Sequence, residues 1–89
     1  MKKQIINHEN RQFLYEAILT LKSVEECEAF FEDLCTIQEL ESMSQRLVVA
    51  KLLTEDKVYT DIVNSTSAST ATISRVNRTL QCGKDGYNT

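Results

Sequence analysis

Residues 58–80, VYTDIVNSTSASTATISRVNRTL, show the pattern of two short helices joined by a turn. Ile62 and Val63 supply the apolar part of the first helix, and the run Ser-Thr-Ser that follows favours a turn over a helix interior. Ser69 is placed to cap a second helix, because a serine oxygen can accept a hydrogen bond from a free amide of the first turn. The stretch therefore predicts a helix-turn-helix.

The second helix of this motif has one apolar stripe and one polar face. Ile73, Val76 and Leu80 recur at helical spacing and predict the buried side. The other residues are small or hydroxylated near the helix N-terminus, with arginines further along. Slender side chains let a helix end approach the major groove closely, and arginines bind bases or phosphates. We expect duplex DNA to be bound by Ser69, Thr70, Ala71, Thr72, Ser74, Arg75 and Arg78.

Two positions depart from the usual helix-turn-helix pattern. A small residue commonly follows the apolar position held here by Ile62, but this chain has Val63. The turn position that is most often glycine corresponds to Ser67. A left-handed backbone at that serine would cost about 1 kcal/mol.

The length and the cysteine content limit the kinds of protein that this chain can be. Its 89 residues predict one domain over residues 1–89. The three cysteines form no Cys-X-X-Cys pair and lie far from His8, the single histidine, so we expect no zinc site and no cofactor. The chain shows no signal peptide and no apolar run of membrane-spanning length, which predicts a cytoplasmic protein without a membrane partner.

Charge is divided unevenly along the chain, whose net charge is −3. Residues 1–45 carry four basic and nine acidic side chains, whereas residues 46–89 carry six basic and four acidic ones. The basic excess therefore lies in the half that contains the helix-turn-helix. Because that excess is small, we expect modest affinity per chain, and a two-fold dimer would double the phosphate contacts.

The rest of the chain predicts further helices and no strand. Proline is absent, both glycines lie in the last seven residues, and no segment alternates as a strand does. Capping boxes begin at Ser23 and Thr36, each with glutamate three residues later. We expect an all-α chain of about five helices, over residues 8–21, 24–34, 37–53, 60–66 and 70–81, with a frayed tail over 82–89.

The first two predicted helices carry aromatic side chains, among them Phe13, Phe30 and Phe31. Five short helices folded as a monomer would leave much of this apolar surface in water, at about 25 cal/mol per Å². Wrapping these helices around a second copy would bury it. We therefore expect a homodimer.

The order and detail of these segments resemble the Trp-repressor-like superfamily, most closely its short bacterial branch of Trp-repressor-related (YerC/YecD-like) proteins. The matching segments are LCTIQELESMSQRLVVAKLL and SASTATISRVNRTL. The resemblance implies an intertwined helical homodimer whose two helix-turn-helix heads enter successive major grooves. It places Thr70, Ala71 and Ser74 near the base edges, with Tyr59 and Thr60 closer to the phosphates.

The resemblance also implies a ligand pocket. In the tryptophan-sensing relative two arginines sandwich the indole ring, and their counterparts here are Arg46 and Arg75, with Thr79 at the position that contacts the ligand amine. That relative has glycine directly after the second arginine, where this chain has Val76. The added side chain fills the space of the ring, so we do not expect tryptophan as corepressor. Another small-molecule corepressor stays an open alternative.

Two other classes of protein are alternatives to a DNA-binding regulator. An enzyme is not expected, because His8 lies near a terminus, no glycine-rich phosphate loop occurs and the acidic residues predict solvated helix faces. The alternative is a helix-turn-helix that binds a protein instead of DNA, for which exposed aromatics or methionine would be typical. Residues 66–81 contain neither. Repressor rather than activator follows from the resemblance alone.

Overall fold

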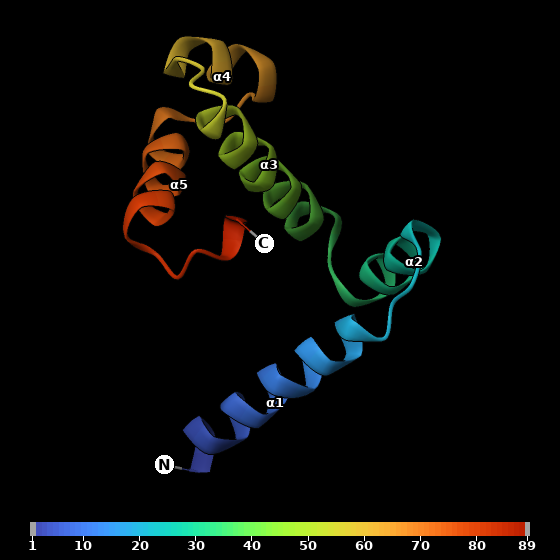
Figure 1. Ribbon diagram of the computed structural model, residues 1–89. Helices are drawn as coiled ribbons and strands as arrows, with labels where there is room; N and C mark the ends of the chain where they lie inside the picture. The colour runs from blue at the N-terminus through green and yellow to red at the C-terminus, as the bar shows by residue number, and fades with distance from the viewer. Residues whose placement is uncertain (1, 89) are drawn as a thin grey trace. The chain divides into compact units, whose positions relative to one another are not determined.

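The computed structural model describes the backbone of residues 2–88 and the burial of side chains in residues 8–87. The described residues form five α-helices and one short 3₁₀ turn, with no strand (Figure 1). The predicted all-α class is confirmed. The elements are α1 (Lys2–Leu19), α2 (Val24–Leu34), α3 (Ile37–Thr54), α4 (Tyr59–Thr66), α5 (Thr70–Cys82) and η1 (Gly86–Asn88).

The chain divides into two compact units, Met1–Thr36 and Ile37–Thr89. The first contains α1 and α2, and the second contains α3, α4, α5 and η1. No described helix combines the length and the apolar character that a bilayer crossing needs.

Helix α1 differs at both ends from the predicted range of 8–21, because it begins at Lys2 and ends at Leu19. Residues 2–7 contain neither proline nor glycine, so nothing stops the helix from starting earlier. At its other end the amides of Thr20 and Leu21 donate to carbonyls three residues back, both at 3.1 Å. This tightening is common in a last helical turn and ends the helix before Leu21.

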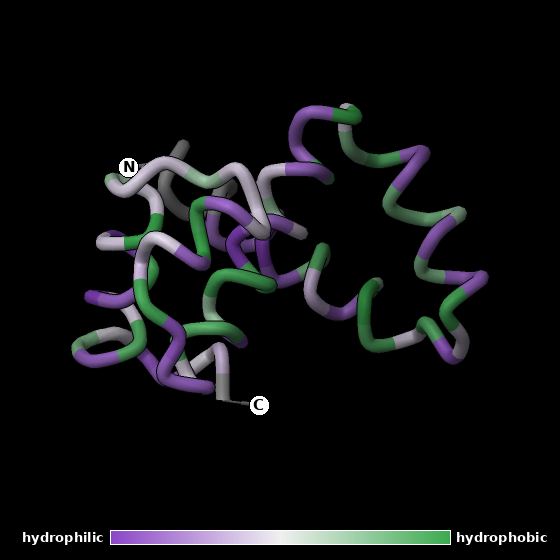
Figure 2. The backbone as a smooth tube through the Cα atoms, turned by 90° about the horizontal axis from the view of Figure 1, so that it is seen from above, coloured by the Kyte–Doolittle hydropathy of each residue, from purple (hydrophilic) through white to green (hydrophobic). Residues whose placement is uncertain are grey.

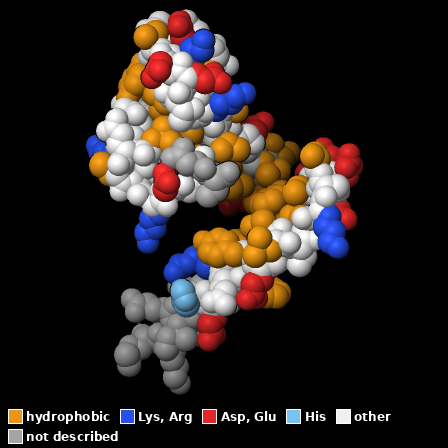
Figure 3. Space-filling model, in the orientation of Figure 1, with side chains coloured by type: hydrophobic (Ala, Val, Ile, Leu, Met, Phe, Trp, Pro, Cys, Tyr) orange, Lys and Arg blue, Asp and Glu red, His pale blue; other side chains and the backbone are white. Residues whose placement is uncertain are grey.

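Helix α2 is capped as its sequence predicts. Ser23 Oγ accepts a hydrogen bond from the amide of Glu26 at 3.1 Å, and Glu26 Oε1 accepts one from the amide of Lys22 at 2.8 Å. Hydrophobic side chains gather on the visible surface of this unit (Figure 3). No side chain of residues 8–36 is buried, and Phe13, Leu19 and Val24 are 73%, 83% and 79% exposed.

The second unit contains the hydrophobic core, to which α3, α4 and α5 each contribute. Figure 2 shows apolar residues recurring along the backbone tube, interspersed with hydrophilic ones. Partly buried Leu52, Leu53, Val63 and Leu80 surround a fully buried cluster. That cluster consists of Val49, Ala50, Ile62, Ala68, Ile73 and Val76.

The tail, predicted to be frayed over residues 82–89, contains a helix cap and a short turn in its described residues. Gly83 caps α5, its amide donating to the carbonyl of Thr79 at 2.8 Å, and the chain then returns through η1. The ring of Tyr87 is partly buried and packs against the core. The glycines and polar residues of this segment suggested fraying, but burial of one aromatic ring offsets the entropy of ordering it.

The turn between α4 and α5 has the left-handed backbone that its position requires. Ser67 has φ 61° and ψ 14°, at a strain of about 1 kcal/mol relative to glycine. Its amide donates to the carbonyl of Val63 at 2.9 Å. From α3, Gln45 Nε2 donates to the carbonyl of Thr66 at 3.0 Å. Ala68, the residue after Ser67, is buried in the core. Packing and hydrogen bonds of the neighbouring residues therefore hold Ser67 in its strained conformation.

Candidate nucleic-acid interface

The N-terminus of α5 is fixed by a side-chain cap. Ser69 has an extended backbone, with φ −72° and ψ 157°, and its Oγ accepts a hydrogen bond from the amide of Thr72 at 3.1 Å. Ser69 Oγ also donates to Thr72 Oγ1 at 3.0 Å. The predicted role of Ser69 as N-cap is confirmed, and it fixes where the first turn of α5 begins.

The two sides of α5 have opposite environments. Ile73 is 0% and Val76 is 2% exposed, and both pack into the core. Thr72 is half-buried at the border between the two sides. The outer side therefore faces solvent along the first three turns, and α5 contains no acidic residue. Over these three turns, the exposed residues on the outer side of α5 are Thr70, Ala71, Ser74, Arg75, Arg78 and Thr79.

Tyr59 and Thr60 open α4, and both are exposed. The hydroxyl oxygen of Tyr59 accepts a hydrogen bond from Asn77 Nδ2 of α5 at 3.3 Å. This contact joins the two helices of the helix-turn-helix at their surface. It also leaves the phenolic proton of Tyr59 available for another acceptor.

A polar pocket of about 420 Å³ lies between α3 and α5 and brings together two of the four predicted ligand-pocket residues, Arg46 and Arg75. The other two do not line it. Val76 is buried in the core, so its side chain is part of the packing rather than of the pocket wall. Thr79 Oγ1 donates to the carbonyl of Arg75 at 3.1 Å, which directs its hydroxyl toward the helix backbone.

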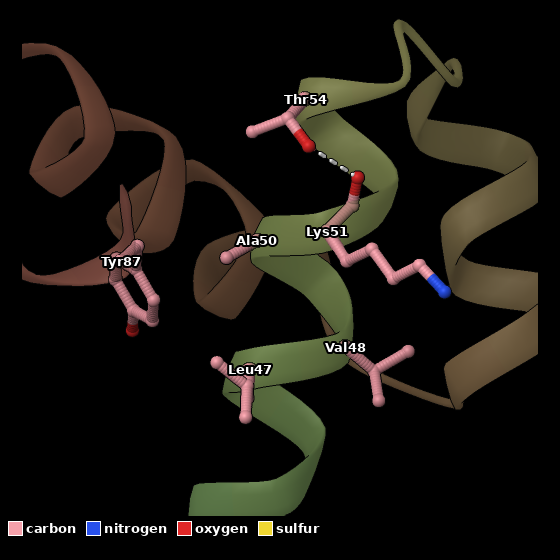
Figure 4. Close-up of a pocket in the computed structure, with 6 residues that line it drawn as sticks. All are labelled: Leu47, Val48, Ala50, Lys51, Thr54 and Tyr87. Carbon is pink, nitrogen blue, oxygen red and sulfur yellow. Dashed lines mark hydrogen bonds between the residues drawn. The ribbon is translucent and has the colours of Figure 1, made fainter. Parts of the chain in front are cut away.

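A second pocket, of about 450 Å³, lies beside α3 and has a different chemical character. Figure 4 shows Ala50 and Leu47 on the side of α3 that faces the ring of Tyr87. Thr54 Oγ1 donates to the carbonyl of Lys51 at 2.7 Å and so caps its own helix turn. None of the residues that line this second pocket belongs to α5. This pocket is therefore not part of the candidate interface.

Comparison with known proteins assigns the chain to one family. The family model described as Trp repressor protein matches residues 9–89, which is nearly the whole chain. The chain belongs to the Trp repressor family. The resemblance found in the sequence is thereby confirmed.

Relatives of this Trp repressor family member include the uncharacterized protein YerC of Bacillus subtilis (strain 168), which is 55% identical over 74 residues, covering 83% of this chain and 71% of YerC. The crystal structure of a TrpR-like protein from Eubacterium eligens ATCC 27750 is 55% identical, with a TM-score of 0.87 and coverage of 90% and 82% of the two chains. That of a candidate Trp repressor from Staphylococcus aureus is 48% identical, with a TM-score of 0.88 and coverage of 99% and 88%. These likenesses place the chain in the short YerC-like branch.

Three residues of this Trp repressor family chain belong to the candidate site although sequence reasoning did not select them. Ser42 and Gln45 line the polar pocket between α3 and α5 that also contains Arg46 and Arg75, and Asn77 contacts Tyr59. Ser42 precedes Arg46 by four residues and lies on the same helical face, a spacing that the sequence already contains. Asn77 carries no comparable signal, because its partner is 18 residues away on another helix.

Proposed function

We propose that this helix-turn-helix regulator is a sequence-specific repressor that binds double-stranded DNA and reads the major groove with α5. One observation carries the proposal, namely the orientation of α5. Because Ile73 and Val76 are sealed in the core, Thr70, Ser74 and Arg75 face solvent. Membership of a regulatory family rather than an enzymatic one supports the same conclusion.

The chemistry of the exposed face suits a duplex groove. Thr70, Ala71 and Ser74 are small, so the N-terminal half of α5 can lie close to base edges. Arg75 and Arg78 follow on the same helix and supply positive charge for bases or phosphates. Tyr59 and Thr60 at the start of α4 are the proposed backbone contacts, with the free phenolic proton of Tyr59 as donor.

We propose that the functional species is an intertwined homodimer, and the first unit supports this. Residues 8–36 bury no side chain, although Phe13, Leu19 and Leu34 are large and apolar. Covering such a surface with a second copy would remove it from water, at about 25 cal/mol per Å². Sedimentation equilibrium at micromolar concentration is expected to give twice the 10.2 kDa of one chain. A monomer mass at that concentration would contradict this part of the proposal.

Tryptophan is not proposed as a corepressor. Val76 directly follows Arg75 in the sequence and is buried in the core, and it adds three carbons where the tryptophan-sensing relative has glycine. Regulation by another small molecule is not part of the proposal.

Binding of duplex DNA is expected to be salt-dependent, because the contacts proposed for arginine include the DNA phosphates, whose neutralisation releases counterions. The affinity should fall linearly with salt on a double-logarithmic plot, and Arg78→Ala should lower that slope by about 1 per subunit. Fluorescence anisotropy with labelled duplexes recovered by selection of bound genomic fragments gives both quantities. The matched control is Arg11→Ala, an exposed arginine on α1, for which we expect an unchanged slope.

The same experiment separates the proposed function from its rival, a helix-turn-helix that binds a protein. Failure of the wild-type protein to bind any duplex at low salt, or an affinity independent of salt, would favour the protein-binding module. A palindrome among the selected fragments would support a dimer with two equivalent reading helices.

A further inference from the structure

Asn77 lies at the border between the buried and the exposed side of α5. It directly follows buried Val76 and stands one helical turn beyond buried Ile73, and its own side chain is half-buried. Its Nδ2 donates a hydrogen bond at 3.3 Å to the hydroxyl oxygen of Tyr59, the first residue of α4. This bond therefore joins the two helices of the motif through side chains 18 positions apart in the sequence.

The start of α4 lacks the kind of cap that fixes the start of α5. Ser69 caps α5 by accepting a hydrogen bond from the amide of Thr72. The N-cap of α4 is Val58, which makes no side-chain hydrogen bond because its side chain is apolar. The hydrogen bond from Asn77 thus fixes the first side chain of α4 from another helix.

The direction of this hydrogen bond determines what the Tyr59 hydroxyl can still do. An amide N–H can only donate, so the phenolic oxygen accepts and its own proton stays available as a donor. Conjugation with the ring keeps a phenolic O–H near the ring plane, which gives it two favoured directions. The N–H of Asn77 occupies one of them, so the proton points in the other. Accepting a hydrogen bond also makes the hydroxyl a stronger donor.

The surroundings of Tyr59 leave this donor accessible. Its side chain is 36% exposed, so the ring is partly covered by the protein while the residue still reaches solvent. Thr60 beside it is exposed as well. The non-bridging oxygens of a DNA phosphate accept hydrogen bonds and donate none, which makes them suitable partners for a hydroxyl whose proton is already directed.

We propose that Asn77 is a positioning residue for DNA binding, which holds the Tyr59 hydroxyl so that its proton points at a phosphate oxygen of the DNA backbone. The inference rests on the proposed function, in which Tyr59 contacts a phosphate. Asn77 itself does not touch the duplex in this arrangement. Because it belongs to α5, it ties the phosphate contact of α4 to the position of the reading helix, and phosphate contacts of this kind set the register of a protein on DNA.

A double-mutant cycle tests the coupling between the two side chains. Tyr59→Phe removes the donor and is expected to weaken duplex binding about tenfold. Asn77→Ala leaves the donor but frees its orientation, so we expect a loss of about threefold. In the Tyr59→Phe background, Asn77→Ala should cause no further loss. Anisotropy with a duplex recovered by selection measures all four affinities.

The matched control is Asn10→Ala, the same change at an exposed position of α1, for which we expect unchanged affinity. Helical circular dichroism and the thermal midpoint of each free variant report whether it is folded.

Duplexes with a single uncharged methylphosphonate separate positioning from a general structural role. Replacing the phosphate that Tyr59 contacts should abolish the loss caused by Asn77→Ala, whereas replacing any other phosphate should leave that loss at about threefold. If Asn77 only held the motif together, its removal would weaken every contact. The loss would then have the same size for every duplex, and that result would overturn the positioning role.

The outcomes distinguish this inference from the function on which it rests. Unchanged affinity in Asn77→Ala, or losses that simply multiply in the double variant, would overturn the positioning role and leave DNA binding intact. A wild-type protein that binds no duplex at low salt would overturn the proposed function, and the role of Asn77 with it.

Discussion

Replacing Ile73 by alanine is expected to lower the free energy of unfolding by about 2–5 kcal/mol, because the side chain is 0% exposed at the centre of the core. The loss combines the transfer free energy of the removed carbons with a cavity that α3, α4 and α5 would have to close. Small domains have only about 5–15 kcal/mol of stability in total, so the variant should melt far below the wild-type protein. Urea unfolding followed by circular dichroism measures the difference.

The control is the neighbouring residue. Ser74→Ala changes an exposed position one step along α5 and should shift the free energy of unfolding by no more than about 0.5 kcal/mol. Both variants are compared at one protein concentration, since the stability of a dimer depends on concentration. A small loss for Ile73→Ala together with a large one for Ser74→Ala would mean that α5 is turned the other way, and the proposed reading face would be lost.

Ser74→Leu is expected to weaken specific DNA binding by about 1–3 kcal/mol, or roughly fivefold to 150-fold, while the protein stays folded. Ser74 is exposed in the second turn of α5, where a branched apolar side chain would replace a small hydroxyl against the base edges. Anisotropy with the selected duplex and with an unrelated duplex measures the specific and the non-specific affinity. Only the specific one should fall, because phosphate contacts give the non-specific part.

Ser65→Leu provides a matched change in the same motif. Ser65 is exposed near the end of α4, and its hydroxyl donates to the carbonyl of Asp61 within its own helix at 2.8 Å. The substitution adds the same bulk without touching the proposed groove-facing side, so DNA affinity should change little. Equal losses of DNA affinity in the two variants would mean that any leucine added to the surface of the motif weakens binding. Loss of helical signal in Ser74→Leu alone would place that residue in the core.

Local patterns predicted the helix-turn-helix closely. The spacing of Ile73 and Val76 gave the buried side of α5, and a hydroxyl residue at position 69 gave its cap. Both features depend on residues within a few positions of each other. Ser67 departs from the glycine that is usual at its position in the motif, and its backbone is nevertheless left-handed, with φ 61°.

The start of α1 and the order of the tail were not predicted. Helix α1 continues back to Lys2 although residues 2–7 carry no strong helix signal. Tyr87 lies in a glycine-containing segment predicted to be frayed, and its ring packs against the core of the second unit. Contacts between residues far apart in sequence decide such cases, and composition does not contain them.

By itself, the sequence determined the all-α class, the two helices of the motif, the cap and the side of α5 that is buried, since each follows from periodicity and local hydrogen bonding. The tertiary structure alone decided that Arg46 and Arg75 share a polar pocket from which Val76 and Thr79 are absent. It also decided that Asn77 contacts Tyr59 across two helices. The physical reason is that side chains from separate helices meet only where packing of the hydrophobic core sets the distance and rotation between those helices.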